Sequence, residues 1–206
     1  MTLEEAIAKI KPLDHNAMEI AQKRWDSIAK PLHSLGKLET LLIQIAGITG
    51  NAEVDLSRRG LIAMCADNGV VEEGVTQTGQ EVTAIVAENF LKYDTSVGVM
   101  CKQNHAEIFP VDMGMVTDTK VRTDHKIAYG TPNMTKGPAM TREQAVKGLE
   151  AGIDMVRELN DKGYRILATG EMGIGNTTTS SAVASVLLKQ PVEEMTGRGA
   201  GLTSEG

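Results

Sequence analysis

The chain alternates between two patterns of apolar and polar residues. Short, nearly continuous apolar runs that end in turn residues lie at 60–69, 106–114 and 164–173, which is typical of strands buried on both faces of a parallel sheet. Longer patterns with helical spacing lie between them, at 79–104 and 141–162. This alternation predicts an α/β fold with a doubly wound, mostly parallel, Rossmann-like sheet and right-handed crossovers.

The first 50 residues differ from the rest because they carry helical patterns and no strand pattern. Three helices are predicted there, with the ladder of backbone hydrogen bonds interrupted at Pro31 and Gly36. We therefore expect an N-terminal helical segment, residues 1–50, that packs on the sheet or on a partner subunit, followed by an α/β domain, residues 51–206. We expect this domain to be incomplete, because nothing follows its glycine-rich carboxyl end to pack against it.

Composition narrows the class of ligand. Only 3% of the residues are aromatic and 11 are methionine, so aliphatic side chains and methionine must fill the core, and surfaces that stack on sugars or nucleic-acid bases are not expected. The formal net charge of −6 argues against binding nucleic acid through a bulk electrostatic field. Any phosphate must therefore be bound locally, by backbone N–H groups or by the start of a helix.

The cysteine, histidine and hydropathy patterns favour a cytoplasmic protein without a metal. Cys65 and Cys101 form no CxxC motif and are predicted to be reduced core residues. The four histidines form no pair at metal-ligand spacing. No stretch approaches the ~20 apolar residues of a membrane span, and the first ten residues are acidic and amphipathic, unlike a secretory signal.

Each predicted strand ends in an acidic residue close to a glycine, namely Asp67, Asp112 and Glu171. Ligands of doubly wound folds bind at the carboxyl ends of the strands, so three carboxylates are expected at one rim. A turn of the type Asp-x-Gly after a strand is also a common structural feature, so each acid alone is weak evidence of function. Glu171 is the strongest candidate, because its flanks are the richest in binding groups.

The segment TGEMGIGNTTTSS, residues 169–181, is the most informative loop. It fits the triphosphate loop G-x-x-x-x-G-K-[ST] except that Asn176 replaces the lysine, which removes the main counter-charge for the β and γ phosphates. A dinucleotide fingerprint also fails, because Thr178 occupies the position of its third glycine. An ordinary threonine-rich helix N-cap remains an alternative.

The chemistry shared by these loops suits a single phosphate. Glycines let the backbone approach an anion, a helix start offers free N–H groups, and side-chain donors complete the site. The residues concerned are Gly173, Gly175, Asn176, Thr177 and Thr178. An acid beside a phosphate favours chemistry on a sugar phosphate, where Glu171 stabilises an oxocarbenium charge or accepts a proton. Partial burial would raise the pKa of Glu171 above the usual ~4.3.

Four segments together resemble one family. They are KPLHSLGKLE, MCADNGVVEEGV, GTPNMTKGPAMT and GEMGIGNTTTSSAV. Their order is similar to that of the nicotinate-nucleotide:dimethylbenzimidazole phosphoribosyltransferase family of cobalamin biosynthesis, over essentially the whole chain. The resemblance implies transfer of the phosphoribosyl group of nicotinate mononucleotide to 5,6-dimethylbenzimidazole, giving α-ribazole phosphate and nicotinate with inversion at the anomeric carbon. It also implies a homodimer and no metal or cofactor.

The resemblance assigns roles by position. Glu171 corresponds to the family's active-site loop glutamate. The phosphate and ribose site comprises Gly173, Gly175, Asn176, Thr177, Thr178 and Gly199. The segment 75–86 would line the pocket for the acceptor base. Residues assigned to that pocket are Asn68, Thr78, Val86 and Met172.

This sequence departs from the family pattern at several of these positions. Asn68 stands where the family has histidine, Thr78 where serine is common, and Val86 where a glutamine is common, so a more apolar base pocket is predicted. A different benzimidazole or a phenolic acceptor remains open. The family's general-base glutamate and phosphate-site lysine are absent from these 206 residues, so we expect this chain alone to be inactive. The alternative is a non-catalytic subunit of a heteromeric phosphoribosyltransferase.

Overall fold

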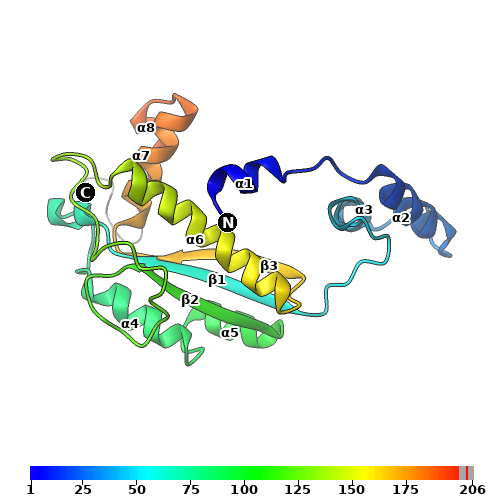
Figure 1. Ribbon diagram of the computed structural model, residues 1–206, viewed down its shortest axis with the longest axis horizontal. Helices are drawn as coiled ribbons and strands as arrows, with labels where there is room; N and C mark the ends of the chain where they lie inside the picture. Colours follow the sequence, from blue (N-terminus) through cyan, green and yellow to red (C-terminus); the bar gives the residue numbers. More distant parts are fainter. Residues whose placement is uncertain (200–202, 204–206) are drawn as a thin grey trace. The chain divides into compact units, whose positions relative to one another are not determined.

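The computed structural model describes residues 1–199 and 203, and these form two compact units (Figure 1). One unit is Thr2–Ser57, and the other consists of Met1 and the described residues from Arg58 onward. The part of the predicted domain 51–206 that falls on residues 200–202 and 204–206 lies outside the described residues. Among the described residues, no helix is both long and apolar enough to cross a bilayer.

The larger unit is built on a three-stranded parallel sheet, which confirms the predicted α/β fold. Its strands are β1 (Arg59–Ala66), β2 (Ala106–Gly114) and β3 (Ile166–Met172), in the spatial order β2-β1-β3. Pro110 lies within β2, where it removes one N–H group. The N–H group of Asp112, two residues on, donates to Arg122 on the side away from β1. Because strand N–H directions repeat every second residue, Pro110 costs the β1 ladder no hydrogen bond.

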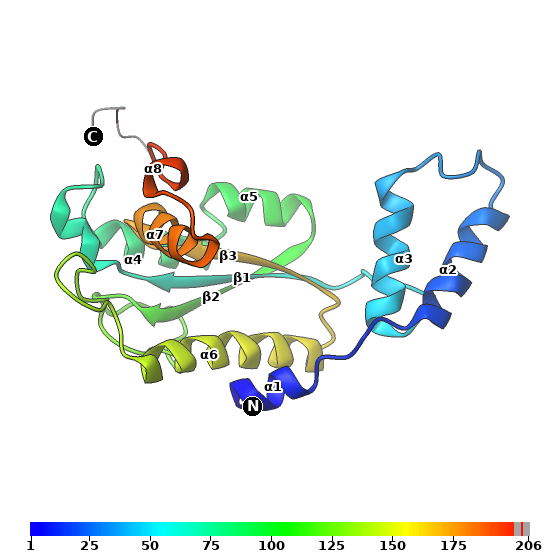
Figure 2. The ribbon, with the colours of Figure 1, turned by 90° about the horizontal axis from the view of Figure 1, so that it is seen from above.

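Helices cover both faces of this sheet (Figure 2). The crossover from β1 to β2 contains α4 (Glu81–Phe90) and α5 (Ser96–Gln103), and the crossover from β2 to β3 contains α6 (Arg142–Asp161). These two crossovers run in opposite directions across the sheet on opposite faces, so they share one hand. The remaining elements of this unit are η1 (Gly69–Glu73), α7 (Asn176–Leu188) and α8 (Val192–Met195).

The pattern with helical spacing at 79–104 forms two helices, because the chain turns between α4 and α5. Tyr93 adopts a positive φ of 57°, which no helix tolerates, and the Thr95 hydroxyl then caps α5 by accepting from the N–H group of Gly98. A side chain at Gly98 would lie 2.6 Å from the Tyr93 carbonyl oxygen. The two helices therefore meet at a close backbone approach that hydrophobic periodicity does not encode.

Two hydrophobic cores lie on the two faces of β1. Cys65 belongs to the core under α4 together with Ala87 and Phe90. Ile62 belongs to the core under α6 together with Leu159. Cys65 and Cys101 are free and buried, as predicted, and burial raises the pKa of the Cys65 thiol to about 12.

The smaller unit consists of three helices, α1 (Leu3–Ala8), α2 (His15–Ser27) and α3 (Lys37–Thr49). The connection between α2 and α3 folds around the carboxylate of Glu39, which is only 2% exposed. Lys30 Nζ lies 2.8 Å from Glu39 Oε1, and the N–H group of Leu35 donates to the same oxygen. The hydrogen bond from Lys30 is the main cause that lowers the pKa of Glu39, against the opposing effect of burial.

This buried pair predicts a pH-dependent contribution to stability. Because the pKa of Glu39 is lower in the folded than in the unfolded chain, its contribution is complete above the unfolded value of about 4.3 and is lost as the pH falls through the folded value. Glu39→Gln should therefore destabilise the helical unit at pH 7, and the destabilisation should become smaller as the pH falls below about 4.3. Urea unfolding followed by fluorescence of Trp25, the only tryptophan, measures this.

Glu53→Gln is the matched control, because Glu53 pairs with Arg24 at 3.8 Å on the surface and its side chain is 85% exposed. An exposed pair of this kind contributes little to stability. Equal destabilisation by Glu39→Gln at pH 7 and at pH 3.5 would contradict the role given to the Glu39 carboxylate.

Candidate functional site

The three acids at the strand ends have different environments. Asp67 and Asp112 are fully buried, whereas Glu171 is exposed. Asp112 Oδ1 accepts from the N–H groups of Gly114 and Met115, at 2.9 and 2.8 Å. The expectation of three carboxylates facing one rim is therefore wrong, and so is the partial burial expected for Glu171. Asp67 and Asp112 bind backbone N–H groups, and of the three acids only Glu171 is open to a ligand.

The buried acids fasten the segment that follows β2. Asp67 Oδ2 accepts from the N–H group of Val116 at 2.8 Å, and Lys126 Nζ lies 3.1 Å from Asp112 Oδ2. Burial alone would lower the pKa of Lys126, but its hydrogen bond and charge interaction with Asp112 raise the pKa on balance. These contacts give Asp67 and Asp112 a structural role.

The glycine loop lies between β3 and α7. A Cβ atom at Gly173 would come within 2.2 Å of the Ala66 carbonyl oxygen, so only glycine lets the loop lie against the end of β1. Gly175 precedes the first residue of α7 and has a φ of 87°. Both glycines are buried, so they shape the loop and hold it against β1.

Two side chains from other elements hold Ile174 at the centre of this loop. Thr83, fully buried in α4, accepts from the N–H group of Ile174 at 3.0 Å. Asn68, in the turn after β1, donates from Nδ2 to the Ile174 carbonyl oxygen at 3.0 Å. Asn68 Oδ1 accepts from the Thr179 hydroxyl of α7 at 3.1 Å. Asn68, predicted to line a base pocket, thus uses its amide to fasten the glycine loop to β1.

The other residues predicted for the base pocket are spread over different surroundings. Val86 and Met172 pack against the hydrophobic core under α4. Thr78 is exposed in the segment before α4, where its carbonyl oxygen accepts from the Thr76 hydroxyl. The pocket assigned to these residues stays a prediction.

A cavity of about 350 Å³ lies beside the glycine loop and collects most of the predicted phosphate-site residues. It is lined by Glu171, Asn176, Thr177, Thr178 and Gly199, all of which the sequence indicated, and by Ser180, Ser181, Thr196 and Gly197, which it did not. Asn176 Nδ2 donates to Glu171 Oε2, which holds the carboxylate at the cavity wall. Ser180 and Ser181 lie three and four residues after Thr177, on the same face of α7. Helical periodicity could therefore have predicted them from the sequence.

The described lining residues of the cavity offer hydrogen-bond donors but include no cationic side chain. The N–H groups of Thr177 and Thr178, in the first turn of α7, have no acceptor among the described residues. Hydroxyl groups add further donors, and the positive end of the helix dipole favours an anion. An exposed carboxylate stands at the same wall. This arrangement suits the phosphate of a sugar phosphate whose reacting carbon approaches Glu171. No three His, Cys, Asp or Glu side chains within residues 1–199 and 203 cluster as metal ligands do.

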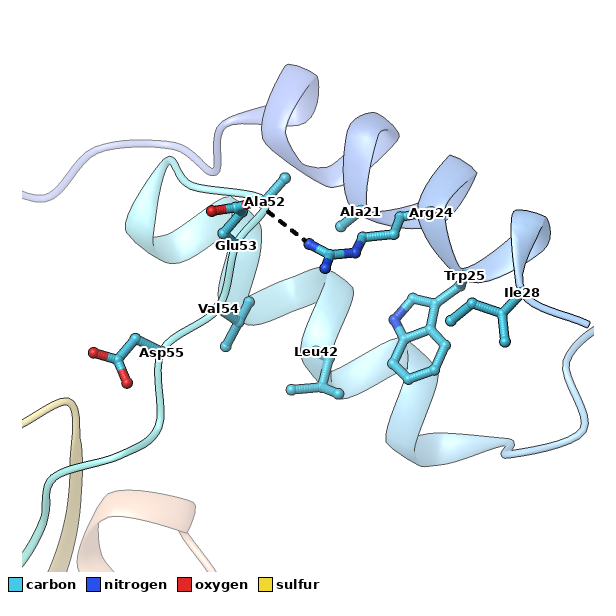
Figure 3. A pocket seen from close by; sticks show the side chains of 9 residues that line it. All are labelled: Ala21, Arg24, Trp25, Ile28, Leu42, Ala52, Glu53, Val54 and Asp55. Carbon is cyan, nitrogen blue, oxygen red and sulfur yellow. Dashed lines mark ion pairs between the residues drawn. The ribbon is translucent and has the colours of Figure 1, made fainter.

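A second hollow belongs to the helical unit (Figure 3). Its volume is about 650 Å³, and it lies among α2, α3 and the segment 52–55. Arg24 reaches across it toward Glu53, and Trp25 forms part of its wall. It contains none of the residues that the sequence indicated for phosphate or base binding.

Comparison with known proteins gives one consistent result. The sequence model of a family described as phosphoribosyltransferase matches residues 10–206. The nicotinate-nucleotide–dimethylbenzimidazole phosphoribosyltransferase of Ruminiclostridium cellulolyticum is 51% identical over 100% of this chain and 59% of its own length. The protein of the same name from Clostridium tetani is 47% identical over 99% of this chain and 57% of its own.

Solved structures agree with these sequence matches. The crystal structure of CobT from Thermus thermophilus superimposes with a TM-score of 0.85 at 35% identity, over 92% of this chain and 58% of the other. The chain thus spans less than three fifths of the length of these relatives.

The hydrogen bonds of Thr83 and Asn68 to the backbone of Ile174, here called the clamp on Ile174, give a direct prediction. Thr83→Val keeps the shape of the side chain but removes the acceptor, so hydrogen exchange of the Ile174 amide should accelerate by about tenfold, the equivalent of one neutral hydrogen bond. Exchange measured by mass spectrometry on the peptide that contains Ile174 reports this.

Thr83→Ser is the control, because it keeps the hydroxyl and loses only a methyl group. It should retain the protection of Ile174. Equal exchange in the valine and serine variants would show that packing, and not the hydrogen bond, holds the loop.

Proposed function

Since this chain belongs to the phosphoribosyltransferase family, we propose that it binds the phosphoribosyl part of nicotinate mononucleotide at the glycine loop. The reaction we propose transfers that group to a ring nitrogen of 5,6-dimethylbenzimidazole or a related base, giving α-ribazole phosphate and nicotinate in cobalamin biosynthesis. The observation that carries the proposal is the cavity beside α7, where uncharged donors and the Glu171 carboxylate share one wall.

The phosphate is bound by the start of α7. The N–H groups of Thr177 and Thr178, in the first turn of the helix, have no acceptor among the described residues, and Thr177 and Ser181 line the cavity. These donors are neutral, so they match the charge of one phosphate better than that of a triphosphate, which requires a lysine or a metal. The ribose then lies between the phosphate and Glu171.

Glu171 stabilises the positive charge that develops on the ribose during the transfer. The bond between the anomeric carbon and the pyridine nitrogen breaks with its electron pair going to nicotinate, and the ribose gains oxocarbenium character. The lone pair of the benzimidazole nitrogen attacks from the opposite face, which inverts the anomeric carbon. The carboxylate stabilises the developing positive charge. The attacking ring loses the proton of its other nitrogen to a general base, a role that the family resemblance assigns to a different glutamate. The hydrogen bond from Asn176 orients the Glu171 carboxylate.

We further propose that the protein is a cytoplasmic homodimer in which the helical unit, Thr2–Ser57, forms contacts between subunits. Apolar side chains of this unit are strongly exposed, and a surface of this kind is typical of an interface. The most exposed of them are Ile7, Ile10, Leu32 and Ile48, with exposed fractions from 58% to 78%. The free cysteines accord with a reducing compartment.

Binding of the donor nucleotide tests the site. Isothermal titration of the chain with nicotinate mononucleotide should show saturable binding, and Thr177→Val should weaken it by about tenfold, because one hydroxyl donor to a charged phosphate is lost. Thr40→Val, on an exposed surface of α3, is the matched control and should bind normally. If nicotinate riboside, which lacks the phosphate, binds as tightly as the mononucleotide, the phosphate site is wrongly placed.

Turnover tests the role of Glu171. In an assay of the whole protein, Glu171→Gln should lower kcat by about 10²- to 10⁴-fold and change the KM for the nucleotide little, because the amide keeps the shape and loses the charge and the basicity. Formation of α-ribazole phosphate, followed by liquid chromatography, gives both constants. An unchanged kcat would leave Glu171 with a structural role only.

A further inference from the structure

A separate cavity lies on the α6 side of the sheet. Its volume is about 300 Å³, and it lies among the carboxyl ends of β1 and β2, the segment 127–140 and the first turns of α6. Met113, Ile127 and Met140 contribute apolar walls, and Gly148 of α6 lies opposite the segment. It shares no lining residue with the cavity beside the glycine loop, so it is a distinct compartment.

The charge of the wall restricts the occupant. Among the residues that the structure describes, no side chain that lines this cavity is ionisable. An ion that entered it would lose hydration without gaining a partner of opposite charge, which is costly in an apolar environment. The uncharged wall therefore favours a neutral ligand over an ion.

The size of the cavity favours a ligand of two fused rings. A dry cavity of about 150 Å³ accommodates benzene, so twice that volume accommodates two fused rings. Gly114 and Gly130 contribute backbone to the wall, where an added Cβ atom would lie 3.3 Å from the Ala128 carbonyl oxygen and 2.9 Å from Val116 Cγ1 respectively. The wall is therefore closely packed at these two glycines.

Two polar side chains at the wall have hydrogen-bond donors that no described residue uses. The Thr131 hydroxyl oxygen accepts from the N–H group of Gly69 at 3.1 Å, and its own proton has no acceptor among the described residues. Gln144 Oε1 accepts from the N–H group of Thr141 at 2.8 Å, which leaves the Nε2 group of Gln144 without a described acceptor. A ligand with a hydrogen-bond acceptor is therefore the best match.

We propose that this cavity is a second small-molecule site that binds a neutral, planar, two-ring aromatic molecule carrying a hydrogen-bond acceptor. The proposal goes beyond the transfer reaction and does not depend on it, because the two cavities have no residue in common. Coumarin is a suitable probe, because it is a neutral two-ring lactone and has no ring nitrogen that could accept a phosphoribosyl group.

A matched pair of variants on α6 tests the site. Gly148 lines the cavity, and a Cβ atom there would lie 3.5 Å from Ile127 Cδ1, an ordinary contact. Gly152, one helical turn later, lies outside this cavity and has no neighbouring atom within 4 Å of an added Cβ. The change to leucine increases helix propensity at both positions, but only Gly148→Leu fills the cavity.

The experiment is a titration of the chain with coumarin by equilibrium dialysis, together with methyl NMR. We expect saturable binding with one coumarin per chain, shifts of the Ile127 and Met140 methyl signals, and affinity at least tenfold lower in Gly148→Leu but unchanged in Gly152→Leu. Nicotinate mononucleotide should not compete. If Gly148→Leu does not fold, as judged by circular dichroism, Ala145→Leu fills the same cavity and takes its place.

Three outcomes would overturn the proposal. They are the absence of saturable coumarin binding to the wild-type chain, equal affinity in the cavity-filling variant and Gly152→Leu, and binding of 2-naphthoate, an anionic two-ring molecule, as tight as that of coumarin. Failure of the nucleotide to bind in the same preparation concerns the glycine loop alone and leaves this test intact.

Discussion

The enclosure of β1 is the constraint on which the rest of the larger unit depends. Its alternate side chains enter two different cores, under α4 and under α6, while β2 and β3 pair with its two edges. Burying one aliphatic side chain of this kind stabilises the fold by roughly 1.5–3 kcal/mol, and β1 contributes on both faces. The place where β1 ends is therefore held from four directions, and the turn after it, residues 67–69, has a well-defined position.

That turn organises the candidate site. Each of its three residues binds a different segment, through Val116, Ile174 and Thr131 respectively. The segment after β2, the glycine loop and the wall of the α6-side cavity are consequently fastened to one point. The two cavities differ in their walls, because one is lined by hydroxyls and an acid and the other is uncharged and mostly apolar. Ala66, the last residue of β1, lines only the second of them.

The spacing of apolar residues predicted the strands and helices that the local sequence specifies. It failed where contacts between distant parts of the chain determine the structure. The strands and α6 follow directly from apolar runs and a capping box. The break at Tyr93 depends on a close backbone approach, which apolar spacing does not reveal. Asp112 and Glu171 look alike in the sequence, each near a glycine at a strand end, but only Asp112 meets N–H groups and Lys126 that bury it. The role of Asn68 depends on a loop more than 100 residues away.

The clamp on Ile174 has a thermodynamic consequence. A glycine-rich loop normally loses much conformational entropy when it closes on an anion. Here the N–H and C=O groups of Ile174 are both bound by side chains of the folded protein, so that ordering takes place during folding and not during ligand capture. A phosphate then binds at α7 without a change in the conformation of the glycine loop. The association rate should therefore be set by diffusional encounter more than by a conformational change of the protein.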